Sequence, residues 1–476
     1  MAPHRLTAAV LGLLAAAGAW PAAAEARQDV PPTDTAAAAS DTAVSDTVPP
    51  DTAAAAPTSY PDRSELPASR TAAGVRTWSR EDLLDSSALS LQDFLLDHAP
   101  GVLPLRAGFF FGPHQLRDGP WGAGGVHLVV DGRELPPLSS GQADLSRISL
   151  ASVERLRLVR RAGETVLHVT TLDHDGGEAY SRISAGTGQP GADGIRGLFT
   201  NTAGDDFTVH ASVDHLNVGV GEMPGNRLDA WAKVSWMPSA GTGLELVWRA
   251  EGLERTLRDS TAEIDRSELL LHARSNLADG LQAEVWAGRS SRDPRPDFFP
   301  DPDSMPGDTM PPDTMPPDTM PSDTAGTGPG TYEVEQILGS LTYRGDDAFL
   351  QLSGGKWTGR GTPELTGRVH GSLRFGPIVA EAGVEAASWP EISTTGWSGG
   401  LAYRPGWWEG TVLRVEAATG SRGSPRPGRT VGDSLVQDYD ALSASAEFEL
   451  GPYRIDGTAA RRTVDRQLPF GGFFDR

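Results

Sequence analysis

The chain has 476 residues, a formal net charge of −22, a hydrophobic fraction of 38% and no cysteine. The absence of cysteine excludes disulfides, thiolate metal sites and a cysteine nucleophile. The acidic balance argues against a nucleic-acid partner, which would require a basic surface. After the N-terminal region, no stretch reaches the roughly 18 consecutive apolar residues of a helical span. A β-barrel is not excluded, because only alternate residues of its strands face lipid.

The N-terminus has the pattern of a secretory signal peptide. Arg5 precedes an apolar run from Leu6 to Ala19, and small residues follow at Ala22, Ala24 and Ala26. The run is too short to span a bilayer, and an Ala-x-Ala cleavage site would remove it. We therefore predict that residues 1–26 are a signal peptide and that the chain is exported.

Residues 27–70 consist mainly of Ala, Asp, Thr and Pro. Such a segment buries too little apolar surface to offset the entropy lost on ordering. We expect a disordered linker in the periplasm.

A second biased segment, residues 293–331, contains a pentapeptide that is repeated four times between Met305 and Thr324. Its proline density favours an extended, solvated conformation. Four thioethers would suit a soft ion such as Cu(I), but no histidine accompanies them. We interpret the segment as a low-complexity surface loop and expect no metal site.

Residues 71–173 have a mixed pattern that predicts a small α/β domain. Ser79 with Asp82 resembles a capping box, and Ser90 is placed to cap a second short helix. Val126–Val130 reads as a strand closed by the turn pair Asp131–Gly132, and Leu156–Arg160 reads as a later strand after a short helical turn.

After Gly177 the hydrophobic period becomes 2. Leu365, Val369 and Leu373, for example, alternate with Arg368, His370 and Arg374. A soluble sandwich also alternates, but its strands are shorter and its buried face bulkier than the Ala- and Gly-rich face seen here. We predict an antiparallel transmembrane barrel over residues 177–476, with about 14–16 strands and the charged face toward the lumen.

Aromatic residues near the expected strand ends suit interfacial girdles. They are Trp236, Trp357, Trp389, Trp397, Trp407, Trp408 and Tyr453.

The order of several short motifs resembles the plug domain of TonB-dependent receptors. Leu91–Leu95 followed by Pro100-Gly101-Val102 is similar to the plug's opening, and Gln115-Leu116-Arg117 is similar to its next motif. Leu128–Gly132 and then Val153–Arg160 follow in the family's order. The residues that carry the resemblance are Pro100, Gly101, Arg117, Asp131, Gly132, Glu154 and Arg160.

The sequence also departs from that family. Asp118 stands where the family usually has Gly, and Arg161-Ala162 stands in place of Gly-Pro. The nearest candidate for a TonB box, Asp41–Val44, lies within Asp-Thr repeats. The expected strands are fewer than the 22 of plugged outer-membrane transporters. These differences suggest a divergent, smaller barrel or a truncated one.

Catalytic patterns occur only in the wrong context. Gly396–Gly400 fits the nucleophile elbow around Ser398, but alternation continues where that motif requires a helix. Gly186–Gly191 fits a dinucleotide pattern, yet Pro190 leaves no helix N-terminus for a pyrophosphate. The ten histidines form no i, i+4 ligand pair. We expect no enzymatic activity, no cofactor and no metal.

The resemblance implies a plugged outer-membrane barrel that takes up a solute with energy supplied through the TonB complex. The barrel assembly machinery and outer-membrane lipid are the other expected partners. An alternative is a plugged barrel that does not transport and serves as a surface-binding or structural protein. A third possibility, an outer-membrane hydrolase, rests on Ser398 alone. The sequence does not identify the ligand.

Overall fold

In the computed structural model, the described part of the chain comprises 17 segments between residues 75 and 464. These are residues 75–106, 115–118, 126–135, 144–162, 164–173, 179–188, 191–203, 206–219, 224–239, 241–257, 260–296, 332–359, 362–389, 392–406, 410–424, 435–450 and 453–464. The expected signal peptide and linker lie outside these residues, as do Trp407 and Trp408. No helix within the described segments is long and apolar enough to cross a membrane.

The N-terminal domain is built on a five-stranded sheet with the order β1-β6-β7-β4-β5. Strand β4 pairs with β7 in parallel, and the other pairs are antiparallel. Strands β2 and β3 form a separate antiparallel pair. The elements are β1 (Val75–Ser79), α2 (Arg80–Asp85), α3 (Leu91–His98), β2 (Val102–Arg106), β3 (Gln115–Asp118), β4 (Val126–Val130), β5 (Arg133–Glu134), η2 (Leu145–Arg147), η3 (Leu150–Ser152), β6 (Val153–Arg160) and β7 (Thr165–Thr171).

Both expected helix caps are present. The Ser79 hydroxyl accepts the Asp82 N–H, and the Asp82 carboxylate accepts the Ser79 N–H at 2.7 Å, which completes the capping box of α2. The Ser90 hydroxyl accepts the Asp93 N–H at the start of α3. Helix α3 then buries Phe94 in the domain's core, which the sheet completes.

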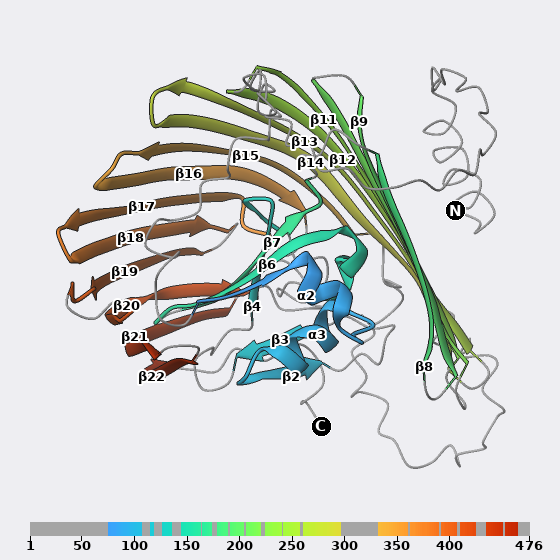
Figure 1. The fold of residues 1–476 in the computed structure, drawn as a ribbon, viewed down its shortest axis with the longest axis horizontal. Coiled ribbons are helices and arrows are strands. Elements are labelled where there is room, and N and C mark those ends of the chain that lie inside the picture. The colour runs from blue at the N-terminus through green and yellow to red at the C-terminus, as the bar shows by residue number, and fades with distance from the viewer. Residues whose placement is uncertain are drawn as a thin grey trace, which may run out of the picture. The chain divides into compact units, whose positions relative to one another are not determined.

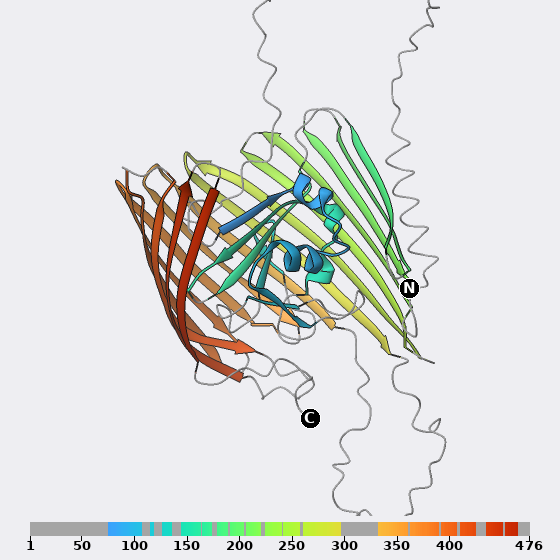
Figure 2. The ribbon, with the colours of Figure 1, turned by 60° about the horizontal axis from the view of Figure 1, so that its bottom comes forward.

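In the described segments, the remaining strands form one 15-stranded sheet in which each strand pairs with its sequence neighbours. All the pairs are antiparallel, so the sequence prediction of an antiparallel barrel fold with about this number of strands is confirmed. Within the described residues, β8 and β22 are the two edges of the sheet. Figures 1 and 2 show the sheet curving around the N-terminal domain, which lies on its concave side.

The bounds of the barrel strands are β8 (Tyr180–Gly188), β9 (Ala192–Ala203), β10 (Phe207–Val218), β11 (Gly225–Ser239), β12 (Thr242–Leu257), β13 (Ser260–Ala278), β14 (Leu281–Pro296), β15 (Tyr332–Arg344), β16 (Ala348–Gly359), β17 (Leu365–Phe375), β18 (Ile378–Ser388), β19 (Ser393–Tyr403), β20 (Val412–Ser424), β21 (Leu435–Leu450) and β22 (Tyr453–Val464).

The two ends of the sheet differ in their connections. The odd-numbered strands are separated from the next strand by at most three residues, as between Phe375 and Ile378, except that β19 is followed by residues 404–411. The even-numbered strands are followed by the connections that include residues 297–331 and 425–434. Because neighbouring strands are antiparallel, all the connections of this second group leave the same end, which we call the long-connection end.

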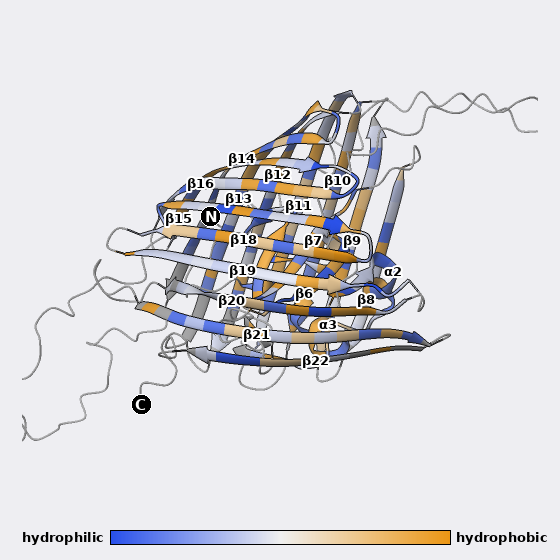
Figure 3. Ribbon diagram, turned by 90° about the vertical axis from the view of Figure 1, so that its left-hand side faces the viewer, coloured by the Kyte–Doolittle hydropathy of each residue, from blue (hydrophilic) through white to orange (hydrophobic). Residues whose placement is uncertain are grey.

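The two faces of the sheet differ as the alternation predicts. Outward side chains are apolar and exposed, as at Ile337 and Leu401, whereas Glu245 and Lys233 on the inner face are almost fully buried. Figure 3 shows the resulting alternation of hydrophobic and hydrophilic positions along the strands. The inner polar face is therefore packed against the N-terminal domain over part of its area.

Two tryptophans and two boundaries differ from the sequence interpretation. Trp357 is only 5% exposed and Trp389 lines an internal cavity, so neither belongs to an outer girdle. In β16, the side chains of Trp357 and Ser353 point to the same, inner face of the sheet. Strand β6 begins at Val153, earlier than expected, and β14 continues through Pro296 into the range interpreted as a loop.

Candidate functional site

The turn Asp131–Gly132, between β4 and β5, is hydrogen-bonded to the end of β7, the last strand of the plug-like domain in the sequence. Asp131 has a φ of 51°, which asparagine and aspartate tolerate better than most residues, and Gly132 has a φ of 82°. The Asp131 carboxylate accepts the Thr171 N–H at 2.9 Å and the Thr171 hydroxyl at 2.6 Å. This motif residue therefore fixes the end of β7, from which the chain proceeds toward the barrel.

The other residues that carry the plug resemblance are placed in separate parts of the domain. Arg160 donates to the carbonyl of Pro100 at 2.7 Å, which ties the end of β6 to the turn after α3. In that turn Gly101 has a φ of 86°. Glu154 pairs with Arg80 at 3.2 Å, and Arg117 lies in β3. These residues connect elements of the domain and do not converge on one site.

Glu268 of β13 is the centre of a buried charge cluster between the plug-like domain and the barrel wall. Arg133 of the domain donates to its carboxylate, and Arg147 lies 3.8 Å away. Arg249 of the wall approaches the same carboxylate at 3.5 Å. The Arg133 and Glu268 side chains are 3% and 5% exposed. Such a pair is costly to break, because the remaining charge would be buried without its counter-ion.

A second charge cluster lies beside the first. Arg266 of the wall contacts Asp144 of the domain at 2.8 Å and Glu251 of the wall at 2.7 Å. It also donates to the Ser146 hydroxyl at 2.8 Å. Asp144 at the same time caps the short helix η2. The wall thus holds the segment that precedes β6.

Hydrogen bonds extend this interface along β10 and β11. The Ser149 hydroxyl donates to Asp214 at 2.9 Å, and Lys233 Nζ donates to the Thr171 hydroxyl at 3.4 Å. Because Thr171 is the partner of Asp131, a plug-motif residue is linked to the barrel wall through one intermediate side chain.

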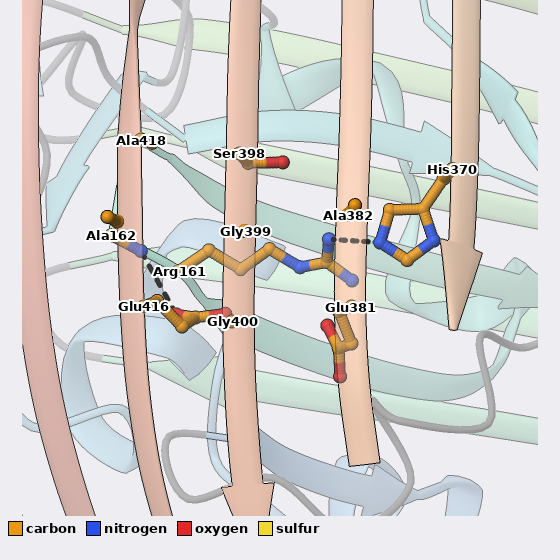
Figure 4. Close-up of a pocket in the computed structure, with 11 residues that line it drawn as sticks. Arg161, Ala162, His370, Glu381, Ala382, Ser398, Gly399, Gly400, Glu416 and Ala418 are labelled. Atoms are coloured by element: carbon orange, nitrogen blue, oxygen red, sulfur yellow. Dashed lines mark hydrogen bonds between the residues drawn. The ribbon is translucent and has the colours of Figure 1, made fainter. Parts of the chain in front are cut away.

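The turn between β6 and β7 contacts another part of the wall, drawn in Figure 4. The Ala162 N–H donates to Glu416 of β20 at 3.2 Å, and the Arg161 guanidinium lies 3.4 Å from His370 Nε2 of β17. Arg161 and Ala162 are the residues that depart from the family's Gly-Pro. In this chain they supply a second contact between domain and wall.

Beside these contacts, a cavity of about 440 Å³ lies between the domain and the wall. Strands β4 and β7 of the domain line one side, and the wall from β14 to β20 lines the other. On the wall side it includes Trp389 after β18, Thr395 at the start of β19 and Gly423 at the end of β20. These positions are at the long-connection end, so the cavity lies toward that end of the barrel.

Two groups of the domain have altered pKa values. Burial lowers the pKa of Arg147 to about 10, although nearby Glu268 opposes the change. Burial together with the charges of Arg157 and Arg161 lowers the pKa of His168 to about 3. His168 is therefore neutral over the physiological pH range, and it lines the cavity as an uncharged donor and acceptor.

Neither pattern associated with catalysis has the required local structure. Ser398 lies inside the continuous strand β19, and Gly186–Gly188 form the end of β8. In the described segments, no group of three or more His, Asp or Glu side chains is arranged to hold a metal ion.

No family model and no curated protein matches the chain. Solved structures match it with a probability of 1.00. The siderophore receptor PirA from Acinetobacter baumannii has a TM-score of 0.60 at 10% identity, covering 83% of this chain and 71% of that one. The iron transporter FrpB from Neisseria meningitidis has a TM-score of 0.60 at 10% identity, with coverages of 82% and 72%.

The copper transporter OprC has a TM-score of 0.58 at 13% identity, covering 86% of this chain and 73% of that one. The fold of this chain is therefore that of TonB-dependent receptors, a barrel with an N-terminal plug domain. The plug-like α/β region of this chain precedes the barrel strands in the sequence.

The sequence interpretation missed the residues of the plug that touch the wall. Arg133, Asp144 and Arg147 do not belong to the motifs that carry the resemblance, whereas the charged face of the barrel strands was predicted to point toward the lumen. A usable signal was present, because neighbouring strands carry charges of both signs on the inner face. Which plug residues neutralise those charges is decided by the docking of the domain.

Proposed function

We propose that this chain is an outer-membrane receptor that takes up a solute through its barrel, with energy supplied by TonB. The observation that carries this proposal is the plug domain, which lies inside the curve of the barrel sheet and is attached to it by buried ionic contacts. An occluded barrel needs an energy source to let a large solute pass. The fold shared with siderophore, iron and copper receptors supports the same function.

Export and membrane placement are parts of this proposal. The signal-peptide pattern of residues 1–26 would direct the chain to the periplasm. The apolar outward face of the strands fits contact with outer-membrane lipid. Insertion would require the barrel assembly machinery. We expect the mature protein in the outer-membrane fraction, with faster electrophoretic mobility unboiled than boiled; recovery in the soluble periplasm without that shift would contradict the barrel assignment.

Contact with TonB is tested by crosslinking the purified protein to the C-terminal domain of TonB. In a variant that lacks residues 34–52, the tether from the plug is shortened while signal cleavage and residues 75–464 are unchanged. A disordered segment of about 44 residues spans on the order of 35 Å, so this deletion removes a large part of its reach. We expect the crosslink to be lost and the heat-modifiable barrel to remain.

A plugged barrel that binds at the surface without transporting is the second candidate. The attachment of the plug to two separate parts of the wall favours it, because both attachments resist displacement of the plug. Absence of any crosslink between the intact protein and TonB would support this candidate and contradict the first.

A further inference from the structure

The cavity between the plug and strands β14–β20 has a composition that indicates which solutes it accepts. Its volume of about 440 Å³ is within the range of small-molecule sites, roughly 300–1,000 Å³. It adjoins the long-connection end, and the connections that follow the odd-numbered strands lie at the opposite end. A solute that enters the barrel from the long-connection end would meet this cavity next to the plug.

Charges of both signs line the cavity in nearly equal number, five carboxylates against four arginines, and several of them are paired within the protein. Arg368 contacts Glu385 at 3.0 Å and Glu164 of the plug at 4.0 Å. His127 lies 3.5 Å from Glu134, and Arg133 is neutralised by Glu268. A site for an anionic solute would instead present cations whose charge is not already neutralised. The lining therefore favours a solute without net charge.

Besides the charged groups and the neutral imidazole of His168, the polar side chains of the lining are mainly hydroxyls and one amide. Gln351 extends from β16, and the hydroxyls come from both the wall and the plug. They belong to Thr170, Ser340, Ser353, Thr366, Thr394, Thr395 and Ser421. Hydroxyl and amide groups donate and accept hydrogen bonds, so they match a solute that carries many hydroxyls.

Trp389 supplies an aromatic surface among these polar groups. A Cβ atom on Gly423 would lie 2.6 Å from Trp389 Nε1, so the absence of a side chain at Gly423 gives the indole its place. Trp389 is partly exposed, whereas Trp357 and Trp286 elsewhere in the lining are buried. An apolar ring face beside hydroxyl and amide groups suits the mixed apolar and hydroxylated faces of a sugar ring.

We propose that the solute bound in this cavity is a short uncharged oligosaccharide, an inference that rests on the proposed receptor function. The ring of Trp389 packs against one sugar, and Gln351 together with the hydroxyls of β15–β20 binds its oxygens. The paired charges of Arg368 with Glu385 and Glu164 select against anionic sugars of the same size.

The test is equilibrium binding by titration calorimetry with the purified full-length protein in detergent. The probes are neutral trisaccharides of glucose, mannose, galactose and N-acetylglucosamine, with trigalacturonate as an anionic probe of equal size. We expect at least one neutral trisaccharide to bind and trigalacturonate to bind about tenfold more weakly or not at all. No binding of any neutral trisaccharide at about 10 mM, or tighter binding of trigalacturonate, would overturn the proposal.

Two substitutions in the cavity and one control outside it test where the sugar binds. Trp389→Ala and the milder Gln351→Leu should each weaken binding about tenfold or more. Trp397→Ala is the matched control, because Trp397 lies on the neighbouring strand but is 60% exposed on the outer face. Equal losses in Trp389→Ala and Trp397→Ala, or none in either cavity variant, would refute this site.

The TonB crosslink on the same preparation separates the two proposals. A crosslink without sugar binding rejects the oligosaccharide and leaves the receptor function standing. Sugar binding without a crosslink rejects TonB-dependent uptake and leaves the ligand assignment standing.

Discussion

Replacement of Glu268 by glutamine should loosen the plug from the barrel wall. Glutamine preserves the shape of the side chain but removes the charge that neutralises Arg133, Arg147 and Arg249. At an effective dielectric constant of about 20, the pairs at 3.8 and 3.5 Å are each worth about 4–5 kcal/mol. Repulsion among the three arginines and the desolvation of the carboxylate offset part of this attraction.

Loss of one partner from a buried ion pair typically costs about 3–5 kcal/mol, and we expect an effect in that range. Because 1.4 kcal/mol corresponds to a factor of ten, amide hydrogen exchange in β4, β6 and β7 should accelerate by about two to three and a half orders of magnitude. The measurement is hydrogen–deuterium exchange of the full-length protein in detergent, followed by peptide mass analysis.

Glu333→Gln is the matched control for Glu268→Gln. Glu333 pairs with Arg289 at 2.7 Å, but both side chains are half exposed, so solvent already screens this pair. Its loss should leave exchange in the plug unchanged. Unchanged exchange in Glu268→Gln, or equal acceleration in both variants, would refute the conclusion that the buried cluster attaches the plug.

Three further predictions concern the plug itself. Asp131→Ala removes both acceptors of Thr171 and places alanine at a positive φ, so the plug should lose about 2–4 kcal/mol by denaturant titration, and Asp131→Asn should lose less. Ser79→Ala removes the N-cap of α2 and should cost about 1 kcal/mol, and an unchanged midpoint would show that this cap contributes nothing. Hydrogen bonds from Ser79 lower the pKa of Asp82, so the cap stabilises the plug above the ordinary pKa of aspartate and is lost as pH falls through the lowered value. His168, with a pKa of about 3, is neutral in the fold but takes up a proton below about 6.5 when unfolded, so plug stability should fall between pH 6.5 and 3. His168→Gln should flatten that pH dependence in acid titrations followed by hydrogen exchange, and an identical pH profile would contradict this assignment.

The sequence by itself determined the local features of this protein. The capping box of Ser79 and Asp82 and the Asp131–Gly132 turn depend on neighbouring residues, and both are present. The barrel strands could be predicted because alternate residues of a strand face opposite sides, so a long apolar face shows as period 2. The order of the plug motifs also predicted that a plug-like domain precedes the barrel in the sequence.

Only the tertiary structure decided how the plug and the wall meet. Glu268 and Arg133 are 135 positions apart in the sequence, and neither alternation nor turn chemistry relates them. Trp357 points inward because of its position in the alternation of β16, and Trp389, just after β18, lines the cavity inside the barrel. The sequence had suggested an outer girdle for both, because aromatic residues near strand ends suit one. Periodicity assigns a residue to a face, but its partner on that face depends on how separate elements pack, because ion pairs and cavities arise from contacts that are distant in the sequence.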